Sequence, residues 1–443
     1  MGMMIPQAII PPMDVSLSLE RIKVWGMKGG MSILDQGIFS ASNFILGILL
    51  ARWLSSEQFG AYTIGLTVLV FVYQFYIAFL LDPMGVLGPA QFPENLREYF
   101  VIHLRSHFAI TIIVGVVFIV ISFAGIENQL LLKQTLFVIG LTLPILLLPW
   151  YLRRVFYVLG RPVVAMWGSV IYTLSLTVLT ILFHQLNLLS SPAAIFITAI
   201  ASLLSGLYLL LIFQIRSLYP SIASFTAVIT ENWNFGKWLI TSSIFIAFAS
   251  QAQIWISAKL LGLSAAGMLR ALQIIVQPMM LTITALTAVA TPTLSLAFSK
   301  GDFESFNRRV VFLSLALLTL AIIFEAFLLI FSIPIEKLIY GGKFSTYAFL
   351  LPIWGTIPLC LAYSSGIQAG LQAAQKPRAF LIAAILWTPA SLGFGIWLTS
   401  RSGIAGATWS TLLGYIVFIL ILSFLYWYWV YRPYISPTTN YHN

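Results

Sequence analysis

The sequence predicts an all-α, polytopic membrane protein with about 12 transmembrane helices in two parallel six-helix repeats around a central cavity. The composition points to the membrane, because 60% of the residues are hydrophobic, 8% are charged and the mean hydropathy is +0.97. Soluble domains carry about 25% charged residues. Uncharged runs of roughly 19 residues or more, enough to cross a hydrocarbon layer of about 30 Å, recur along the chain. A turn between two of these runs also recurs in the second half.

Counting such runs gives twelve expected spans joined by short connections. They lie at 33–54, 61–81, 107–126, 133–152, 162–183, 191–215, 237–258, 265–298, 310–332, 346–374, 378–400 and 404–430. No connection is long enough to house a soluble domain. We therefore expect an N-terminal cytoplasmic segment at 1–31, a first bundle at 32–216, a cytoplasmic linker at 217–236, a second bundle at 237–431 and a cytoplasmic tail at 432–443.

The basic residues predict that both termini lie in the cytoplasm and that the chain spans the cytoplasmic (inner) membrane. With twelve spans, sixteen of the 23 Lys and Arg residues fall on the side of the N-terminus. The seven on the other side are Arg52, Lys133, Lys259, Arg270, Lys337, Lys343 and Arg401. Lys and Arg are enriched in cytoplasmic loops, so the more basic side is assigned to the cytoplasm. Residues 1–31 lack a compact apolar stretch before a small-residue cleavage site, so no removable signal peptide is expected.

A short sequence repeat relates the two halves. Residues 51–60, Ala-Arg-Trp-Leu-Ser-Ser-Glu-Gln-Phe-Gly, align without a gap on 258–267, Ala-Lys-Leu-Leu-Gly-Leu-Ser-Ala-Ala-Gly, and share alanine, a base, leucine and glycine at the same offsets. A weaker echo links Gly160-Arg161-Pro162 to Gln375-Lys376-Pro377. Because each half would hold six helices, the halves share their orientation, which predicts a parallel repeat about an axis normal to the membrane.

Three motifs within residues 32–90 resemble a known family. They are Asp35-Gln36-Gly37, the 51–60 turn, and Leu81-Asp82-Pro83-Met84 followed by Val86-Leu87-Gly88-Pro89. Together they resemble the Wzx-type flippases of polysaccharide and O-antigen biosynthesis, in the multidrug, oligosaccharidyl-lipid and polysaccharide (MOP) exporter superfamily, although glutamate is more usual at the position of Asp82. The resemblance implies a transporter that moves an isoprenoid-diphosphate-linked oligosaccharide from the inner to the outer leaflet by alternating access.

Two polar stripes are candidates for the wall of the substrate cavity. In the span 265–298, one helical face carries Arg270, Gln273, Gln277, Thr284 and Thr291. A guanidinium group pairs with phosphate in forked geometry and amides suit sugar hydroxyls, although such residues also join helices in membranes. In the span 33–54, Gln36, Ser40, Asn43 and Gly47 share a face that must meet protein or water. Arg52 and Lys259 lie either at the outer mouth of the cavity or among lipid headgroups.

Two acids are candidates for ion coupling or gating. Glu325 lies within an apolar run, about 22 Å along a helix that begins at Val310, and acids inside membranes commonly serve function. A helix shifted by one turn would instead bring Glu325 to the interface. Asp35 opens the first span, where the helix dipole alone favours an acid, and a gate or ion role is the alternative. The coupling ion would be H⁺ or Na⁺.

Other chemistries find little support in the sequence. His103 and His107 have a metal-compatible spacing but no nearby third ligand, so no metal is expected. The single cysteine, Cys360, offers no disulfide, and without a Gly-rich phosphate loop no nucleotide or other cofactor is expected. The net charge of +10 rests on only 23 basic residues, so no nucleic-acid partner is predicted. Expected partners are the lipid-linked oligosaccharide, the bilayer and other membrane proteins of polysaccharide assembly.

Two alternative functions stay open. A multidrug or cation exporter of the same superfamily would want several acids in its cavity, whereas bases and amides are more numerous here. A membrane glycosyltransferase, polymerase or ligase of the same pathway would need a sizeable outer loop for its chemistry, and the longest expected outer loop spans only about 332–345. The sequence therefore predicts a transporter rather than an enzyme.

Overall fold

The computed structural model describes residues 19–123, 129–214, 225–376 and 378–435, and all regular structure in these ranges is helical. The first half contains α1 (Leu19–Trp53), α2 (Ser56–Tyr76), the π-helical turn η1 (Ile77–Leu81), α3 (Asp82–Gln91), α4 (Leu96–Phe123), α5 (Leu130–Val158), α6 (Pro162–Gln185) and α7 (Ser191–Phe213). The second half contains α8 (Phe225–Leu261), α9 (Leu263–Ser299), α10 (Phe303–Tyr340), the 3₁₀ turn η2 (Ser345–Leu350), α11 (Leu351–Ala373), α12 (Arg378–Tyr426), η3 (Trp427–Tyr431) and α13 (Arg432–Ile435).

Twelve membrane crossings follow from these helices. Eleven helices in the described ranges are long and apolar enough to cross a membrane. The last of them holds two crossings, because Gly403 has non-helical backbone angles (φ 59°, ψ −135°). A side chain at Gly406 would collide with the carbonyl of Leu398, and the Trp387 and Phe418 rings lie 4.9 Å apart, so the chain reverses at this point. The all-helical, twelve-span prediction is therefore confirmed.

Several helices extend beyond the predicted spans. α1 begins at Leu19 rather than at 33, and α2, η1 and α3 form one continuous rod to Gln91 rather than ending at 81. α4 and α8 also begin earlier than expected, at Leu96 and Phe225. Counting uncharged runs finds only the part of a helix that suits lipid, because a helix that leaves the hydrocarbon layer can carry charges freely.

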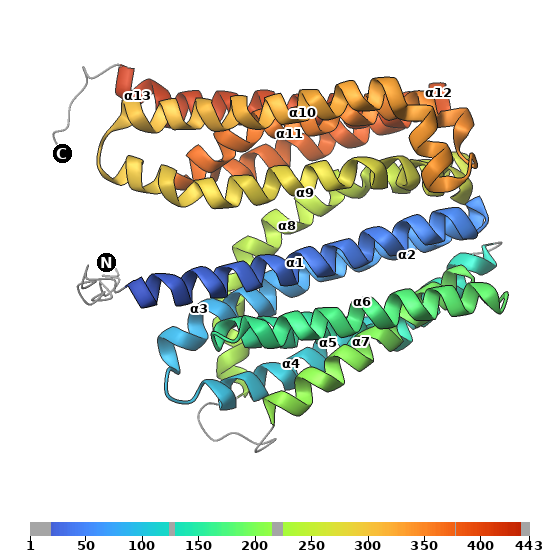
Figure 1. Ribbon diagram of the computed structural model, residues 1–443, viewed down its shortest axis with the longest axis horizontal. Helices are drawn as coiled ribbons and strands as arrows, with labels where there is room; N and C mark the ends of the chain where they lie inside the picture. Colours follow the sequence, from blue (N-terminus) through green and yellow to red (C-terminus); the bar gives the residue numbers. More distant parts are fainter. Residues whose placement is uncertain (1–18, 124–128, 215–224, 377, 436–443) are drawn as a thin grey trace.

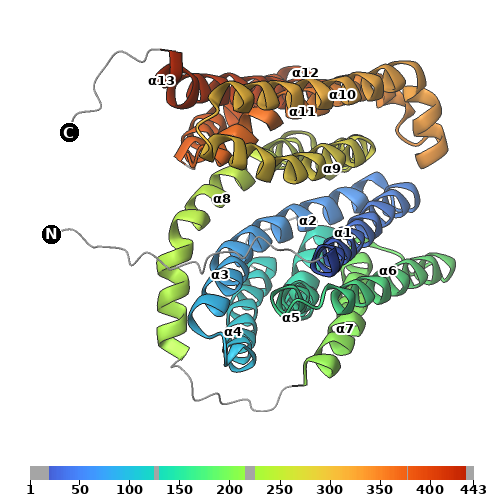
Figure 2. The ribbon, with the colours of Figure 1, turned by 60° about the vertical axis from the view of Figure 1, so that its left-hand side comes forward.

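The helices form two lobes that α8 connects (Figure 2). We call α1–α7 the N-lobe and α9–α13 the C-lobe. Near its start α8 packs on the N-lobe, where Asn232 Nδ2 lies 3.1 Å from His103 Nε2. Further along it packs on the C-lobe, where Gln253 Nε2 donates a 2.9 Å hydrogen bond to the Ser391 carbonyl. Much of the predicted linker at 217–236 is thus helix, and residues 217–224 lie outside the described residues.

Corresponding turns of the two halves have the same backbone geometry. After α5, the Arg161 N–H donates to the Phe156 carbonyl at 2.8 Å, and after α11 the Lys376 N–H donates to the Leu371 carbonyl at 2.9 Å. The residue before each donor has a positive φ, 68° at Gly160 and 55° at Gln375, as in a Schellman helix end. The weak echo between these two segments is therefore a structural repeat.

The repeated turns 51–60 and 258–267 lie at one end of the molecule, and the start of α1 and α13 lie at the other (Figure 1). We call these the turn end and the termini end. At the turn end the two repeats meet, because a side chain at Gly60 would collide with the Leu263 carbonyl, and one at Gly267 would lie 2.9 Å from the Gly60 nitrogen. The two turns therefore lie together at one end of the molecule, as a parallel repeat requires.

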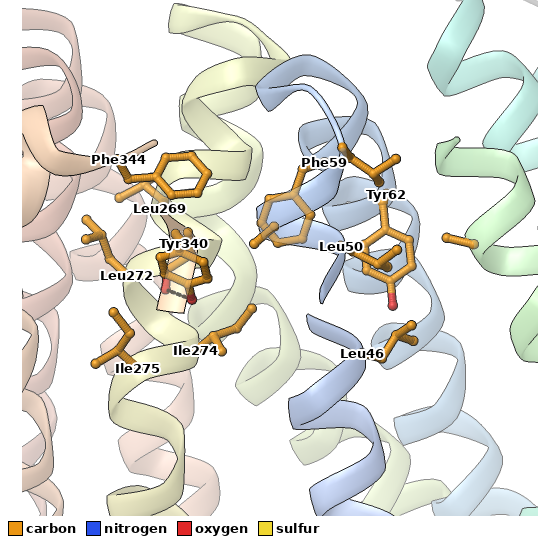
Figure 3. Packing of buried hydrophobic residues seen from close by; sticks show 14 of the residues in the cluster. Leu46, Leu50, Phe59, Tyr62, Leu269, Leu272, Ile274, Ile275, Tyr340 and Phe344 are labelled. Carbon is orange, nitrogen blue, oxygen red and sulfur yellow. Dashed lines mark hydrogen bonds between the residues drawn. The ribbon is translucent and has the colours of Figure 1, made fainter. Parts of the chain in front are cut away.

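A hydrophobic cluster closes the seam between the lobes near the turn end. It joins side chains of α1 and α2 to side chains of α9 and α10 (Figure 3). Leu50, Phe59, Leu269 and Tyr340 are nearly or completely buried there. The lobes are thus packed against each other at the turn end by apolar contacts. Such contacts are non-directional, so they do not fix the relative position of the lobes by themselves.

Candidate functional site

Asp35 lies inside α1, sixteen residues after its first residue, and is completely buried. The interpretation that it stabilises a helix start is therefore wrong, because the helix dipole acts only over the first turn. Arg153 of α5, also buried, donates to Asp35 Oδ2 from Nη2 at 2.7 Å and from Nε at 3.2 Å. The hydroxyls of Tyr157 and Ser169 donate to the same carboxylate.

This network fixes α1 against α5 and α6. A buried carboxylate is tolerated only when its oxygens are paired, and here two hydroxyls and a forked guanidinium group supply the donors. The guanidinium carbon also lies 4.3 Å from the centre of the Phe39 ring. Asp35 is thus a fully partnered structural anchor in this conformation, and its ion or gating role stays a prediction.

A pocket of about 180 Å³, lined by both charged and apolar side chains, lies beside the network. Its lining residues are Gln36, Tyr73, Ile77, Leu81, Asp82, Trp150, Arg153, Arg154 and Tyr157. Arg154 differs from its neighbour, because it is partly exposed and its Nη2 lies 3.4 Å from Asp82 Oδ1. Ile77 and Leu81 belong to the π-helical turn η1, a distortion that occurs frequently at functional sites.

One lining residue of the pocket, Gln36, shares the face of α1 that meets α9 at Gly47. Gly47 marks this face, because a side chain there would lie 2.9 Å from Ile274 of α9. Gln36 lines the pocket and is eleven residues from Gly47, which is about three helical turns, so the two residues lie on the same face of α1. Toward the termini end the same face is open, because Gln36 and Asn43 are exposed. On α9, Thr284 is exposed in the same way.

The predicted stripe on α9 runs from the closed seam toward the open end. Arg270 and Gln273 are half-buried, with Arg270 Nη1 3.3 Å from Gln273 Oε1. Arg270 also interacts electrostatically with Tyr62 of the N-lobe and Tyr340 of the C-lobe, so it lies at the junction of the lobes. Gln277 is half-buried one turn further along the same face. The stripe's role in substrate binding stays a prediction.

Three other predicted residues lie near the surface. Asn43 donates from Nδ2 to the Phe39 carbonyl of its own helix at 3.0 Å. Arg52, in the last turn of α1, is exposed, and its Nη1 reaches the Leu338 carbonyl of α10 at 3.4 Å. Lys259 is exposed in the last turn of α8. The two repeat-related bases therefore both lie at the turn end, but the structure gives an interlobe contact only for Arg52.

Glu325 of α10 points at α11. A side chain at Gly355 would collide with Glu325 Oε2, and this oxygen is buried without a hydrogen-bond partner among the described residues. The carboxyl group therefore faces protein rather than bare lipid. An unpartnered, buried carboxyl oxygen is costly when ionised, so the site suits a group that carries a proton for part of a cycle.

The two histidines hold helices together. His107 contacts the Tyr76 hydroxyl at 2.7 Å and the Pro144 carbonyl at 3.0 Å, whereas His103 contacts the Tyr99 carbonyl at 3.1 Å and Asn232 at 3.1 Å. His107 thus joins α4 to α2 and α5, whereas His103 joins α4 to α8 through Asn232 and also meets a carbonyl one turn earlier in its own helix. In the part of the chain that the structure describes, no group of three His, Cys, Asp or Glu residues could hold a metal ion.

Sequence reasoning missed the partners of Asp35. From the sequence, Arg153 and Arg154 are most simply topology anchors, with recruitment of a diphosphate headgroup at a basic cytoplasmic mouth as the alternative, and nothing singles out Tyr157 or Ser169. One signal was available, because Asp35 and Arg153 are opposite charges at the same predicted membrane end, close to the edges of the spans 33–54 and 133–152. Opposite charges at equal depth are candidates for pairing, since an unpaired charge there is expensive.

Comparison with known proteins places the fold. No protein-family model and no curated protein matches the sequence. Among solved structures, the inward-facing conformation of a multidrug resistance MATE family transporter of the MOP superfamily matches 92% of this chain and 100% of its own, at 14% identity and a TM-score of 0.77. The lipid II flippase MurJ in an inward closed conformation matches 91% of this chain and 87% of its own, at 15% identity and a TM-score of 0.69.

The outward-facing conformation of a multidrug resistance MATE family transporter has a lower TM-score to this chain than the inward-facing one. It matches 94% of this chain and 96% of its own at 14% identity, with a TM-score of 0.59. The chain thus has the fold of MOP superfamily transporters. At these identities the likeness shows the fold alone.

Proposed function

We propose that this protein is a flippase that moves an isoprenoid-diphosphate-linked oligosaccharide across the cytoplasmic membrane for polysaccharide biosynthesis. The observation that carries the proposal is the pocket of the N-lobe beside Asp35, where Arg153 and Arg154 line one small volume together with Gln36, which shares the α1 face that meets α9 at Gly47. This arrangement suits a diphosphate, because the partly exposed Arg154 can donate two parallel hydrogen bonds to phosphate oxygens, and the Arg153 guanidinium group, paired with Asp35, lines the same pocket.

The partners of the two arginines prepare the pocket for an anion. Asp35 holds Arg153 by its Nε and Nη2 atoms, which fixes the guanidinium group in one orientation. Asp82 holds Arg154 only loosely, at 3.4 Å and with about 40% of each side chain exposed. A diphosphate entering from the termini end would therefore displace Asp82 from Arg154 while the Asp35 network stays intact.

The lobe arrangement supports alternating access. The seam is packed at the turn end, whereas the polar faces of α1 and α9 are exposed toward the termini end. Fold likeness is greater to an inward-facing relative than to an outward-facing one. If the termini end is cytoplasmic, as the basic residues predict, a lipid-linked sugar made in the cytoplasm meets an open cleft.

Coupling to H⁺ or Na⁺ is assigned to Glu325. The carboxyl group faces Gly355 across the α10–α11 contact, and one of its oxygens lacks a partner among the described residues. A change in its charge would alter this contact directly. The bound ion would then bias α10, which contacts the N-lobe at the turn end through Leu338.

Ligand-induced thermal stabilisation tests the proposed binding. In detergent, isoprenoid-diphosphate oligosaccharide should raise the unfolding temperature, since a ligand at about 100 times its Kd stabilises a protein by about 2.7 kcal/mol. Arg154→Gln should weaken this stabilisation, and the matched change Arg401→Gln at an exposed position should not. Stabilisation by a cationic dye but not by the diphosphate lipid would favour the multidrug exporter instead.

A further inference from the structure

The turn after α10 reaches across the seam to the end of α1. Lys343 Nζ donates to the Ala51 carbonyl at 2.7 Å and to the Leu54 carbonyl. α1 ends at Trp53, so these carbonyls belong to its last turn and its end. The last four carbonyls of a helix have no partner within the helix, and the helix dipole makes this end negative. An ammonium group from the other lobe satisfies both requirements.

A reciprocal contact runs in the opposite direction. Arg52, in the last turn of α1, donates from Nη1 to the Leu338 carbonyl at 3.4 Å. Leu338 lies in the last turn of α10, which ends at Tyr340. Each lobe therefore gives one cation to the negative end of a helix in the other lobe.

The backbone around Lys343 is held in position before it meets α1. Gly341 and Gly342 have φ values of 72° and 86°, a conformation that side chains disfavour. The completely buried Glu336 accepts a 2.7 Å hydrogen bond from the Phe344 N–H at its Oε1, and Tyr340 donates to the Ala271 carbonyl at 2.8 Å. Lys343 is thus presented by a fixed turn, and little conformational entropy is lost when it binds.

Burial alone does not explain why Lys343 lies here. Its partial burial lowers the pKa of the amine, because water is removed from the charge. Placing a charged ammonium group at the rim of an otherwise apolar seam is therefore unfavourable unless its contacts compensate for the lost water. Apolar packing is non-directional and can slide, whereas charge-assisted hydrogen bonds break over a short distance. A seam that must open and reclose gains a defined closed position from such contacts.

We propose that Lys343 and Arg52 form a reciprocal helix-end latch that holds the turn end shut while the termini end is open. Opening of the turn end must separate Lys343 from α1 and Arg52 from α10. This proposal rests on the proposed function and names the contacts that stabilise its closed state at the turn end. Its test measures conformation rather than transport, so failure of the latch and failure of the flippase assignment are distinguishable.

Thiol labelling at two reporter positions tests the latch. The single cysteine, Cys360, is first replaced by alanine, and one new cysteine is then introduced by Ala61→Cys or Thr284→Cys. Ala61 is completely buried in the interlobe seam at the turn end, with Leu263 and Ala266 in the same cluster. Thr284 is exposed on α9 toward the termini end. The full chain is reconstituted in vesicles and treated with a water-soluble maleimide.

Lys343→Gln should raise the labelling rate at position 61 by more than about tenfold, because tenfold is the effect of losing one hydrogen bond to a charged group and Lys343 makes two. The rate at position 284 should fall. Arg52→Gln should do the same more weakly, because its bond is longer and exposed. Lys337→Gln, at an exposed lysine in the last turn of α10, six residues before Lys343, is the matched control and should change neither rate. Unchanged rates in Lys343→Gln, or a rise at both positions as in general loosening, would overturn the latch.

Discussion

Arg153 Nη2 lies 2.7 Å from Asp35 Oδ2 with both side chains buried, whereas the next residue, Arg154, meets Asp82 at 3.4 Å with about 40% of each side chain exposed. Two adjacent arginines on one helix thus form ion pairs in different surroundings. The buried pair joins α1 to α5, and the exposed pair borders the pocket. Breaking the buried Arg153–Asp35 pair should therefore lower the stability of the protein. Breaking the exposed Arg154–Asp82 pair should have little effect on stability, and loss of Arg154 should weaken binding in the pocket.

Asp35→Asn should destabilise the protein strongly. The change leaves the Arg153 charge buried without a counter-charge, a loss of about 3–5 kcal/mol for comparable buried pairs. Unfolding in detergent, followed by circular dichroism, measures the effect. Asp82→Asn is the control and should cost at most about 1 kcal/mol, because water screens an exposed pair. Equal destabilisation by the two changes would contradict the assignment of Asp35 as the anchor.

Gly60→Ala should weaken the closed seam. A methyl group there would collide with the backbone carbonyl of Leu263, which cannot move without shifting α9. We expect about 1–3 kcal/mol of destabilisation, as for overpacked cores, together with faster labelling of a cysteine at position 61. Gly37→Ala on α1 is the control, since nothing lies within 4 Å of its added methyl group. An unaltered seam in Gly60→Ala would show that the two repeats do not pack as described.

Charge at Arg270 should matter for transport. Arg270→Lys keeps the charge but loses the forked geometry, so transport should fall moderately, and Arg270→Glu should nearly abolish it by repelling a diphosphate. Arg401→Glu is the matched reversal at an exposed position, where charges are screened over about 8 Å. Complementation of a flippase-deficient strain is measured together with protein level in the membrane. If Arg270→Glu inserts normally and complements, the stripe on α9 serves helix packing.

Glu325→Gln should uncouple transport from the ion gradient. The amide keeps the shape of the side chain but cannot change its charge, so the α10–α11 contact at Gly355 would no longer respond to protonation or Na⁺. Transport rates in vesicles with and without an imposed gradient measure the effect. Glu57→Gln, at an exposed acid in the first turn of α2, should leave the gradient dependence intact. A Glu325→Gln protein that still responds fully would remove Glu325 from the coupling mechanism.

The sequence predicted the span count because hydrocarbon thickness imposes a long apolar run on every crossing. It did not predict where α1 and α8 begin, since helix outside the hydrocarbon layer needs no such run. The repeat was readable at Gly60 and Gly267 because the two halves meet there, backbone against backbone, and a side chain at either position would collide. Because the two turns approach each other so closely, only glycine fits at these equivalent positions.

Site residues were harder to predict where they depend on distant partners. Asp35 and Arg153 are 118 residues apart, and no local pattern marks their contact. Likewise, the sequence places Lys343 only on the outer side of the membrane, although its ammonium group reaches carbonyls nearly 300 residues earlier. Periodicity along α9 did place Arg270, Gln273 and Gln277 on one face beside the lobe seam. Which face of a helix is polar is a local property, whereas its partner depends on the packing of the whole bundle.

Leaflet exchange in vesicles tests the central claim most directly. Purified protein is reconstituted with a fluorescent isoprenoid-diphosphate oligosaccharide in one leaflet, and the label that reaches the other leaflet is measured with an impermeant quencher. We predict transfer in the presence of the protein, slower transfer with Arg154→Gln, and wild-type transfer with Arg401→Gln. A lipid that stays in its leaflet while the same vesicles transport a cationic dye would contradict the flippase assignment.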